Sequence, residues 1–111
     1  MSISQVVLFS AFVLSLNACS GVDTSDLTNP FAGSSEAAAL GAKLYEAQGC
    51  VTCHGADGAG SGDFPSIISA AQGDSDGEIF DIIQNGSGAM PAFDMLSDDE
   101  IWQIVTHLRT L

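Results

Sequence analysis

The sequence predicts an all-α domain, and three observations support this fold class. Apolar residues recur at helical spacing in three stretches, two of these stretches begin with a Ser–x–x–Glu capping pattern, and no stretch alternates apolar and polar residues as a half-buried strand does. The chain has 111 residues, which suits one domain, and 46% of them are apolar, which is enough for a packed core.

The first predicted helix has Ser35 before it and Gly49 after it as caps. Its apolar residues follow the spacing of one helical face, which we expect to be buried. These residues are Ala37, Leu40, Gly41, Leu44 and Tyr45. A shorter helix is expected over residues 66–72, after a glycine-rich loop at residues 55–62.

Two further helices are predicted from their capping boxes. One begins at Ser75 with Glu78 at the third following position, and it ends at Asn85 and Gly86. The other begins at Ser97 with Glu100 and continues to the end of the chain. The residues that these helices are expected to bury are Ile79, Ile82, Ile83, Ile101, Ile104, Val105 and Leu108.

The chain is strongly acidic, because it has 14 Asp and Glu residues but only two Lys and Arg residues, Lys43 and Arg109, which gives a net charge of −12. Such a chain is repelled by phosphates, which excludes nucleic acid and anionic membrane surfaces as partners. We expect a protein partner with a basic docking surface. Ten carboxylates lie around the predicted chemical motif and the two later helices, many of them near helix N-termini: Asp57, Asp63, Asp74, Asp76, Glu78, Asp81, Asp94, Asp98, Asp99 and Glu100.

The N-terminus indicates export. Residues 6–16 form an apolar run that is too short to span a membrane and typical of a signal-peptide core. The small residue Ala18 before Cys19 resembles the lipobox of bacterial lipoproteins, whose cysteine is lipidated and becomes the new N-terminus. An ordinary secretory signal cut nearby, or no export, are the alternatives.

The chain is therefore predicted to have three parts. Residues 1–18 are the signal peptide, residues 19–34 are a flexible tether that begins with the lipidated Cys19, and residues 35–111 are the folded domain. A domain of this size gains little net stability from an apolar core alone, so a bound group would help it to fold.

The chemistry is indicated by the sequence Cys50-Val51-Thr52-Cys53-His54, which has the C-x-x-C-H spacing of covalent haem attachment. Two thiols one helical turn apart can add to the two vinyl groups of one porphyrin edge, and the adjacent imidazole of His54 can bind the iron. A zinc site would need more ligands than His107 and Cys19 offer. A thioredoxin-type dithiol would accompany a βαβ pattern, which is absent, and a structural disulfide would not explain His54.

A second axial ligand is predicted at Met90. This residue lies in a Gly/Pro loop, Gly88-Ala89-Met90-Pro91, rather than on an apolar helix face, so the loop can direct its thioether at the iron. Met95 is the rival ligand, but its position beside Leu96 favours packing. His107 is expected to be a surface or packed histidine.

Together, three motifs resemble class I monohaem cytochromes c across residues 35–111. They are Gly41-x-x-Leu44-Tyr45-x-x-x-Gly49-Cys50-x-x-Cys53-His54-Gly55, then Gly88-x-Met90-Pro91-x-Phe93, and then Ser97-x-x-Glu100-Ile101-Trp102. The resemblance implies three to four helices around one covalently bound haem c.

The resemblance also implies particular roles for single residues. The first and last helices should cross at right angles, with Gly41 allowing close approach and Tyr45 and Trp102 packing around the crossing. The carbonyl of Pro65 should accept a hydrogen bond from the second ring nitrogen of His54, which would orient the imidazole. Asp57 should lie near the exposed haem edge, where it could contribute to docking.

These features predict an electron carrier at the bacterial envelope rather than an enzyme, because His/Met ligation leaves no open position on the iron. Ser20 after the lipidation site resembles outer-membrane sorting, so the expected location is the periplasm or the outer membrane, with a lipid anchor as the membrane contact. Two alternatives are a dedicated electron-transfer subunit of a periplasmic dehydrogenase or reductase complex, and a haem-based sensor in which Met90 dissociates readily.

Overall fold

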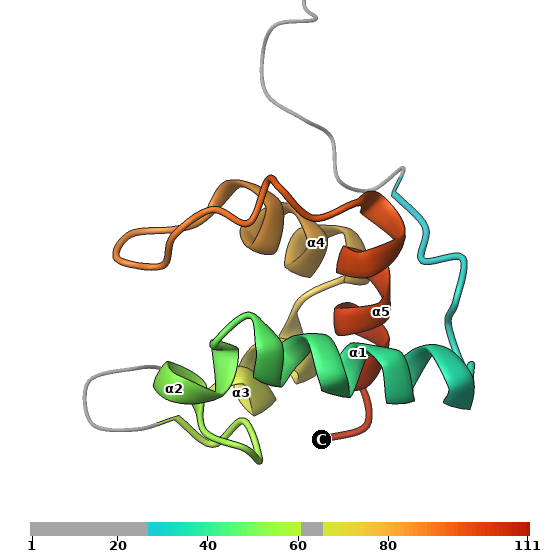
Figure 1. Cartoon of the computed structure of the whole chain (residues 1–111), viewed down its shortest axis with the longest axis horizontal. Helices are drawn as coiled ribbons and strands as arrows, with labels where there is room; N and C mark the ends of the chain where they lie inside the picture. Colours follow the sequence, from blue (N-terminus) through green and yellow to red (C-terminus); the bar gives the residue numbers. More distant parts are fainter. Residues whose placement is uncertain (1–26, 61–65) are drawn as a thin grey trace, which may run out of the picture.

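The computed structural model describes residues 27–60 and 66–111. Within these residues the fold is all-α, as predicted, with one isolated β-bridge and no strand. The described residues form five helical segments, which can be followed in chain order in Figure 1. They are α1 (Ser35–Ala47), α2 (Cys50–His54), α3 (Ile67–Gly73), α4 (Asp76–Asn85) and α5 (Asp98–Leu108).

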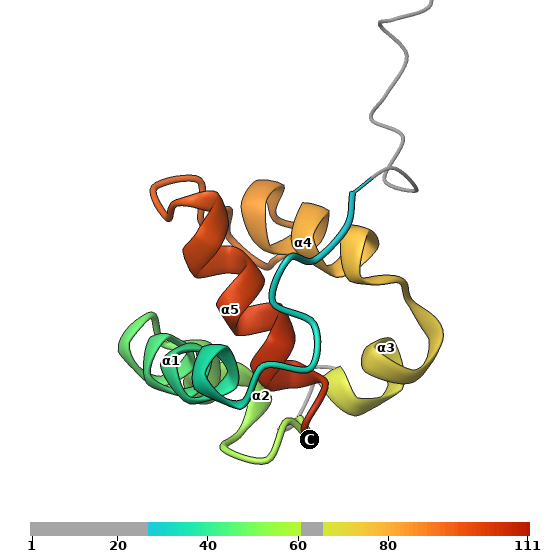
Figure 2. The same cartoon turned by 90° about the vertical axis from the view of Figure 1, so that its right-hand side faces the viewer.

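Helices α1 and α5 cross each other at the centre of the domain (Figures 1 and 2). Gly41 lies at the crossing, where a Cβ atom on this residue would be 1.9 Å from the backbone oxygen of Gln103. The close approach expected at Gly41 is therefore confirmed. Tyr45, one turn further along α1, makes a T-shaped ring contact with His107 of α5, with 5.3 Å between the ring centroids. Trp102 packs its ring against Phe80 of α4 instead, at 4.3 Å.

Helix α5 forms the centre of the hydrophobic core. Ile101, Ile104 and Val105 have exposed fractions of 0–1%, because α1 and α4 cover them from two sides. Ile79 and Ile83 of α4 are buried as predicted. Leu40 departs from the prediction, because it is 46% exposed at the edge of the α1 stripe. The buried face of α1 is narrower than its apolar pattern, since the buried residues of this helix are Ala37, Gly41 and Tyr45 while Leu44 is only partly buried.

The ends of α4 and α5 follow the local sequence. Both capping boxes are present, with Ser75 accepting from the amide of Glu78 and Ser97 accepting from the amide of Glu100, each at 3.1 Å. The predicted start of α1 is one residue late, because Ser34 is the cap and its hydroxyl accepts from the amide of Ala37. Helix α5 also stops before the end of the chain.

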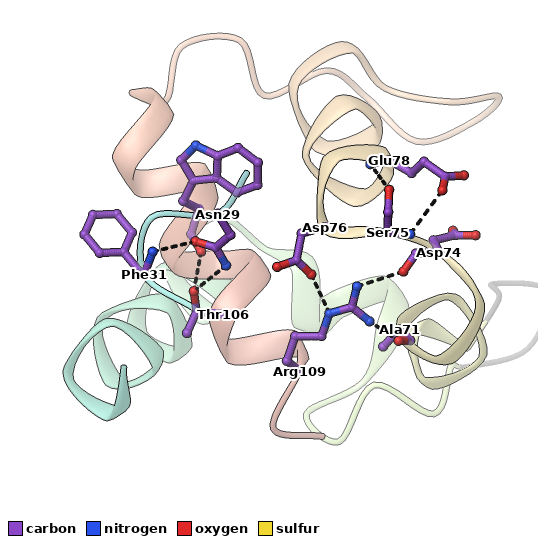
Figure 3. A network of polar contacts seen from close by, with 10 residues as sticks. Asn29, Phe31, Ala71, Asp74, Ser75, Asp76, Glu78, Thr106 and Arg109 are labelled. Carbon is purple, nitrogen blue, oxygen red and sulfur yellow. Dashed lines mark hydrogen bonds and ion pairs between the residues drawn. The ribbon is translucent and has the colours of Figure 1, made fainter. Parts of the chain in front are cut away.

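The predicted tether is partly folded onto the domain. Leu27 and Phe31 pack against the core, and Asn29 is 6% exposed. The Asn29 side chain donates to the hydroxyl of Thr106 on α5 at 3.0 Å and accepts from the amide of Phe31 at 2.9 Å (Figure 3). The expectation that residues 27–34 form a free linker is therefore wrong, because a buried side-chain hydrogen bond attaches them to α5.

A second polar network ties the end of α5 to the α3–α4 connection (Figure 3). The guanidinium of Arg109 forms an ion pair with Asp76 at 2.6 Å and donates to the backbone oxygen of Asp74 at 2.7 Å. It also donates to the backbone oxygen of Ala71 at the end of α3. One of the two basic side chains of the protein therefore serves to hold α3 and α4 in place.

Candidate haem site

The predicted attachment motif forms the one-turn helix α2. Gly49 precedes it with a φ of +82°, a conformation that glycine adopts at little cost, and this allows the chain to turn sharply out of α1. Cys50 and Cys53 are free thiols, and both are half-buried. Burial raises the pKa of the Cys50 thiol above its ordinary value, and the neighbouring Cys53 acts in the same direction. The two thiols lie one turn apart, as the predicted chemistry requires.

The backbone around His54 is held from three sides. The His54 carbonyl accepts from the amide of Gly60 at 2.8 Å, and the amide of Gly55 donates to the Val51 carbonyl at 2.9 Å. The Gly55 carbonyl accepts from the hydroxyl of Tyr45 at 2.6 Å. The end of α2 is therefore bonded to itself, to the following loop and to α1.

Met90 lies in a tight loop that is attached to the end of α4. Ser87 and Met90 exchange two backbone hydrogen bonds of 3.1 and 2.9 Å, and the amide of Phe93 donates to the Ile83 carbonyl at 2.9 Å. Gly86 lies beneath the loop, where a Cβ atom would be 2.7 Å from the Met90 carbonyl oxygen. Met90 is half-buried against the core. The loop is thus a fixed support for this thioether.

The side of the domain that holds α2 and the Met90 loop has an incomplete apolar surface. Figure 1 shows both segments projecting to the same side, away from residues 27–34. Six apolar side chains or thiols from four parts of the chain touch the core but remain partly exposed: Leu44, Cys50, Val51, Ile67, Met90 and Phe93. A thiol pair, an imidazole and a thioether beside such a surface are the donor set of a c-type haem. The residues present fit this group.

The remaining predicted site residues divide into two groups. Pro65 and Cys19 lie outside the described residues. Met95 is 69% exposed, so the expectation that it packs is wrong: the buried position of this turn is taken by Leu96, whose amide donates to the Phe93 carbonyl. His107 is half-buried against Tyr45, and burial lowers its pKa.

Two parts of this arrangement were missed by sequence reasoning. The hydrogen bond from the Tyr45 hydroxyl to the Gly55 carbonyl could not be predicted, because helical periodicity indicates that Tyr45 is buried but not which group its phenol contacts. A buried tyrosine in place of phenylalanine is nevertheless a sign that such a partner exists. The close approach of Gly86 to the Met90 loop had no sequence sign beyond its place at the end of a helix.

No helix within the described parts of the chain is long and apolar enough to cross a membrane.

Comparison with known proteins agrees with the geometry. Residues 36–108 match the family described as cytochrome C oxidase, cbb3-type, subunit III. The chain is also similar to cytochrome c-555 of Methylococcus capsulatus, with 39% identity over 54 residues that cover 49% of this chain and 44% of the relative. The match therefore spans less than half of that relative's length. Because the family match extends from the first turn of α1 to the last residue of α5, the chain belongs to this cytochrome c family and is a class I monohaem cytochrome c, a protein that binds haem c covalently.

Proposed function

We propose that the protein is a single-electron carrier of the bacterial envelope, with the haem attached to Cys50 and Cys53 and with His54 and Met90 as axial ligands. The observation that supports this most is that two segments fixed by backbone hydrogen bonds, α2 and the Met90 loop, both carry partly exposed apolar side chains. When bound, the haem iron supplies a reversible one-electron couple.

The protein's own residues would tune this couple. A thioether ligand favours the reduced iron, and the apolar side chains of Ile67 and Phe93 would exclude water from the porphyrin and so favour the less charged, reduced state. With both axial positions filled, no site remains at the iron for a substrate, which favours a carrier over an enzyme.

The location and the partner follow from sequence features. Cytochromes of this family are typically exported, and the predicted signal peptide with a lipidated Cys19 would keep the domain at the periplasmic face of a membrane. With a net charge of −12, the protein would be attracted to a basic docking surface on its redox partner, and it would associate fastest at low salt. Asp57 is exposed and close to α2, which suits it for such docking.

The test compares visible spectra of the wild type with two methionine variants, produced in a host that matures c-type haem. Met90→Ala should abolish the far-red Met–iron band of the oxidised protein. Met95→Ala is the matched control, because Met95 is 69% exposed, and it should leave this band unchanged. Loss of the band in Met95→Ala, or its persistence in Met90→Ala, contradicts the proposed ligation.

A second candidate function is supported by the family match, whose description names a subunit of an oxidase. In that case the protein would be a dedicated electron-transfer subunit rather than a free shuttle. Purification of the intact protein from its membranes distinguishes the two, because a subunit copurifies at a fixed stoichiometry and a shuttle does not. Carbon monoxide binding to the reduced protein at neutral pH would instead indicate a sensor with a labile Met90.

A further inference from the structure

We propose that Tyr45 is a positioning residue for the axial histidine: its hydroxyl holds the Gly55 carbonyl and thereby fixes the backbone from which the His54 imidazole projects. This proposal rests on the ligation by His54 proposed above. It assigns to Tyr45 a role at the iron site in addition to its packing at the helix crossing.

Of the three hydrogen bonds described above around His54, the one from Tyr45 is donated by a side chain, and the other two join backbone groups. The bonds of Gly60 to His54 and of Gly55 to Val51 are made within residues 50–60, so they move together with the attachment segment. The bond of the Tyr45 hydroxyl to Gly55, at 2.6 Å, joins this segment to α1. It therefore fixes the segment relative to the core.

The donor itself is firmly placed. Tyr45 is 2% exposed, its ring makes a T-shaped contact with the ring of His107, and it lies one turn from the Gly41 crossing with α5. Burial raises the pKa of the Tyr45 phenol, which keeps the hydroxyl protonated and able to donate. A short hydrogen bond from so rigid a side chain constrains the acceptor peptide, because neither the ring nor its helix can follow if that peptide moves.

The consequence lies in the orientation of the imidazole. Gly55 has a φ of +81° and no side chain of its own to pack, so the Gly55–Ala56 peptide, whose carbonyl accepts from Tyr45, depends on hydrogen bonds for its position. Without the phenol, the Gly55 peptide and the His54 backbone are expected to sample more orientations. The ring would then occupy a less defined angle about the iron–nitrogen bond.

The experiment uses the haem-loaded protein and Tyr45→Phe, which keeps the ring and removes the hydroxyl. The hyperfine-shifted NMR resonances of the His54 ring report its orientation in the oxidised protein. They are expected to move and broaden in the variant, and exchange of the Gly60 amide is expected to accelerate by up to about tenfold.

Thr110→Val is the matched control. It removes another hydroxyl-to-carbonyl hydrogen bond of 2.6 Å, from Thr110 to His107, at the exposed end of α5. This variant should leave the His54 resonances and the Gly60 exchange rate unchanged. If Tyr45→Phe lowers the melting temperature but leaves both readouts at their wild-type values, Tyr45 is a packing residue only and the proposal is wrong.

A second measurement covers the case in which Tyr45→Phe does not mature. Tyr45 is the single tyrosine of the chain, so growth with 3-fluorotyrosine labels this position alone. Fluorine makes the phenol more acidic and strengthens its donated bond, so Gly60 exchange should slow; an unchanged rate overturns the proposal. If the oxidised wild type lacks hyperfine-shifted His54 resonances, it is the proposed ligation that fails.

Discussion

The two sides of this small domain differ in how their side chains are buried. On one side, α4 and α5 pack against each other, Leu27 and Phe31 pack onto them, and Ile101 and Val105 are fully buried. On the other side, Cys50, His54 and Met90 are held by backbone hydrogen bonds but remain half-buried. The first side is stabilised by the chain's own apolar contacts, whereas the second has its backbone fixed and its surface left for the porphyrin.

This contrast shows how a chain near the lower size limit for a stable core can prepare a cofactor site. The helix crossing is made by protein atoms of α1 and α5, and the attachment segment is bonded to it through Tyr45. Supports that are ordered in advance reduce the conformational entropy lost when the group is attached.

Removal of the haem should produce the largest difference between the two sides. In Cys50→Ala/Cys53→Ala, which cannot attach haem, we expect amide exchange in α2 and at Phe93 to approach that of an unfolded chain. The amides of α5 should keep the strongest remaining protection, because Ile104 and its neighbours are covered by protein. Hydrogen exchange with peptide-level detection measures this, and equal loss of protection on both sides would remove the distinction drawn here.

Substitution at the helix crossing should have the next largest effect. Gly41→Ala places a Cβ atom 1.9 Å from the Gln103 backbone oxygen, so α1 and α5 must separate. We expect a loss of about 3 kcal/mol or more in the free energy of unfolding, measured by denaturant titration of the haem-loaded protein. Gly73→Ala is the control, because nothing lies within 4 Å of a Cβ there. A similar loss in both variants would contradict the steric explanation.

Loss of the Arg109 contacts should have a moderate effect. Arg109→Met removes the ion pair with Asp76 and two bonds to backbone oxygens, all of them partly exposed, so we expect a loss of about 1 kcal/mol. Exchange of α3 amides should accelerate more than that of α1 amides. Lys43→Met removes the other basic side chain, and it should alter neither the stability nor the exchange of α3.

The smallest expected effect concerns pH. Burial lowers the pKa of His107 below its unfolded value of about 6.5, so the unfolded chain binds a proton before the folded one does. Stability should therefore fall as the pH drops through about 6.5 and level off below the folded pKa. The difference in melting temperature between wild type and His107→Gln, measured from about pH 8 to about pH 5, isolates this group; a difference that does not change with pH contradicts the shift.

Local sequence determined the secondary structure and the identity of the chemical groups. The capping boxes at Ser75 and Ser97 and the spacing of Cys50, Cys53 and His54 act between residues a few positions apart, so they can be recognised without any knowledge of distant contacts. The match of the whole motif series then identified the family before any contact was known. The predicted helix ends needed small corrections, since the cap of α1 is Ser34 instead of Ser35 and α5 ends at Leu108 instead of the last residue.

Only the tertiary structure decided which side chains are buried and which distant residues they bond to. Asn29 and Thr106 are 77 positions apart, and Arg109 reaches Asp76 across 33, so no local pattern could pair them. Leu40 and Met95 look like core residues by pattern but are exposed, because burial depends on which neighbouring element reaches that face. The physical reason is that periodicity and capping are set by short-range backbone geometry, whereas burial and long-range hydrogen bonds exist only once the helices have packed.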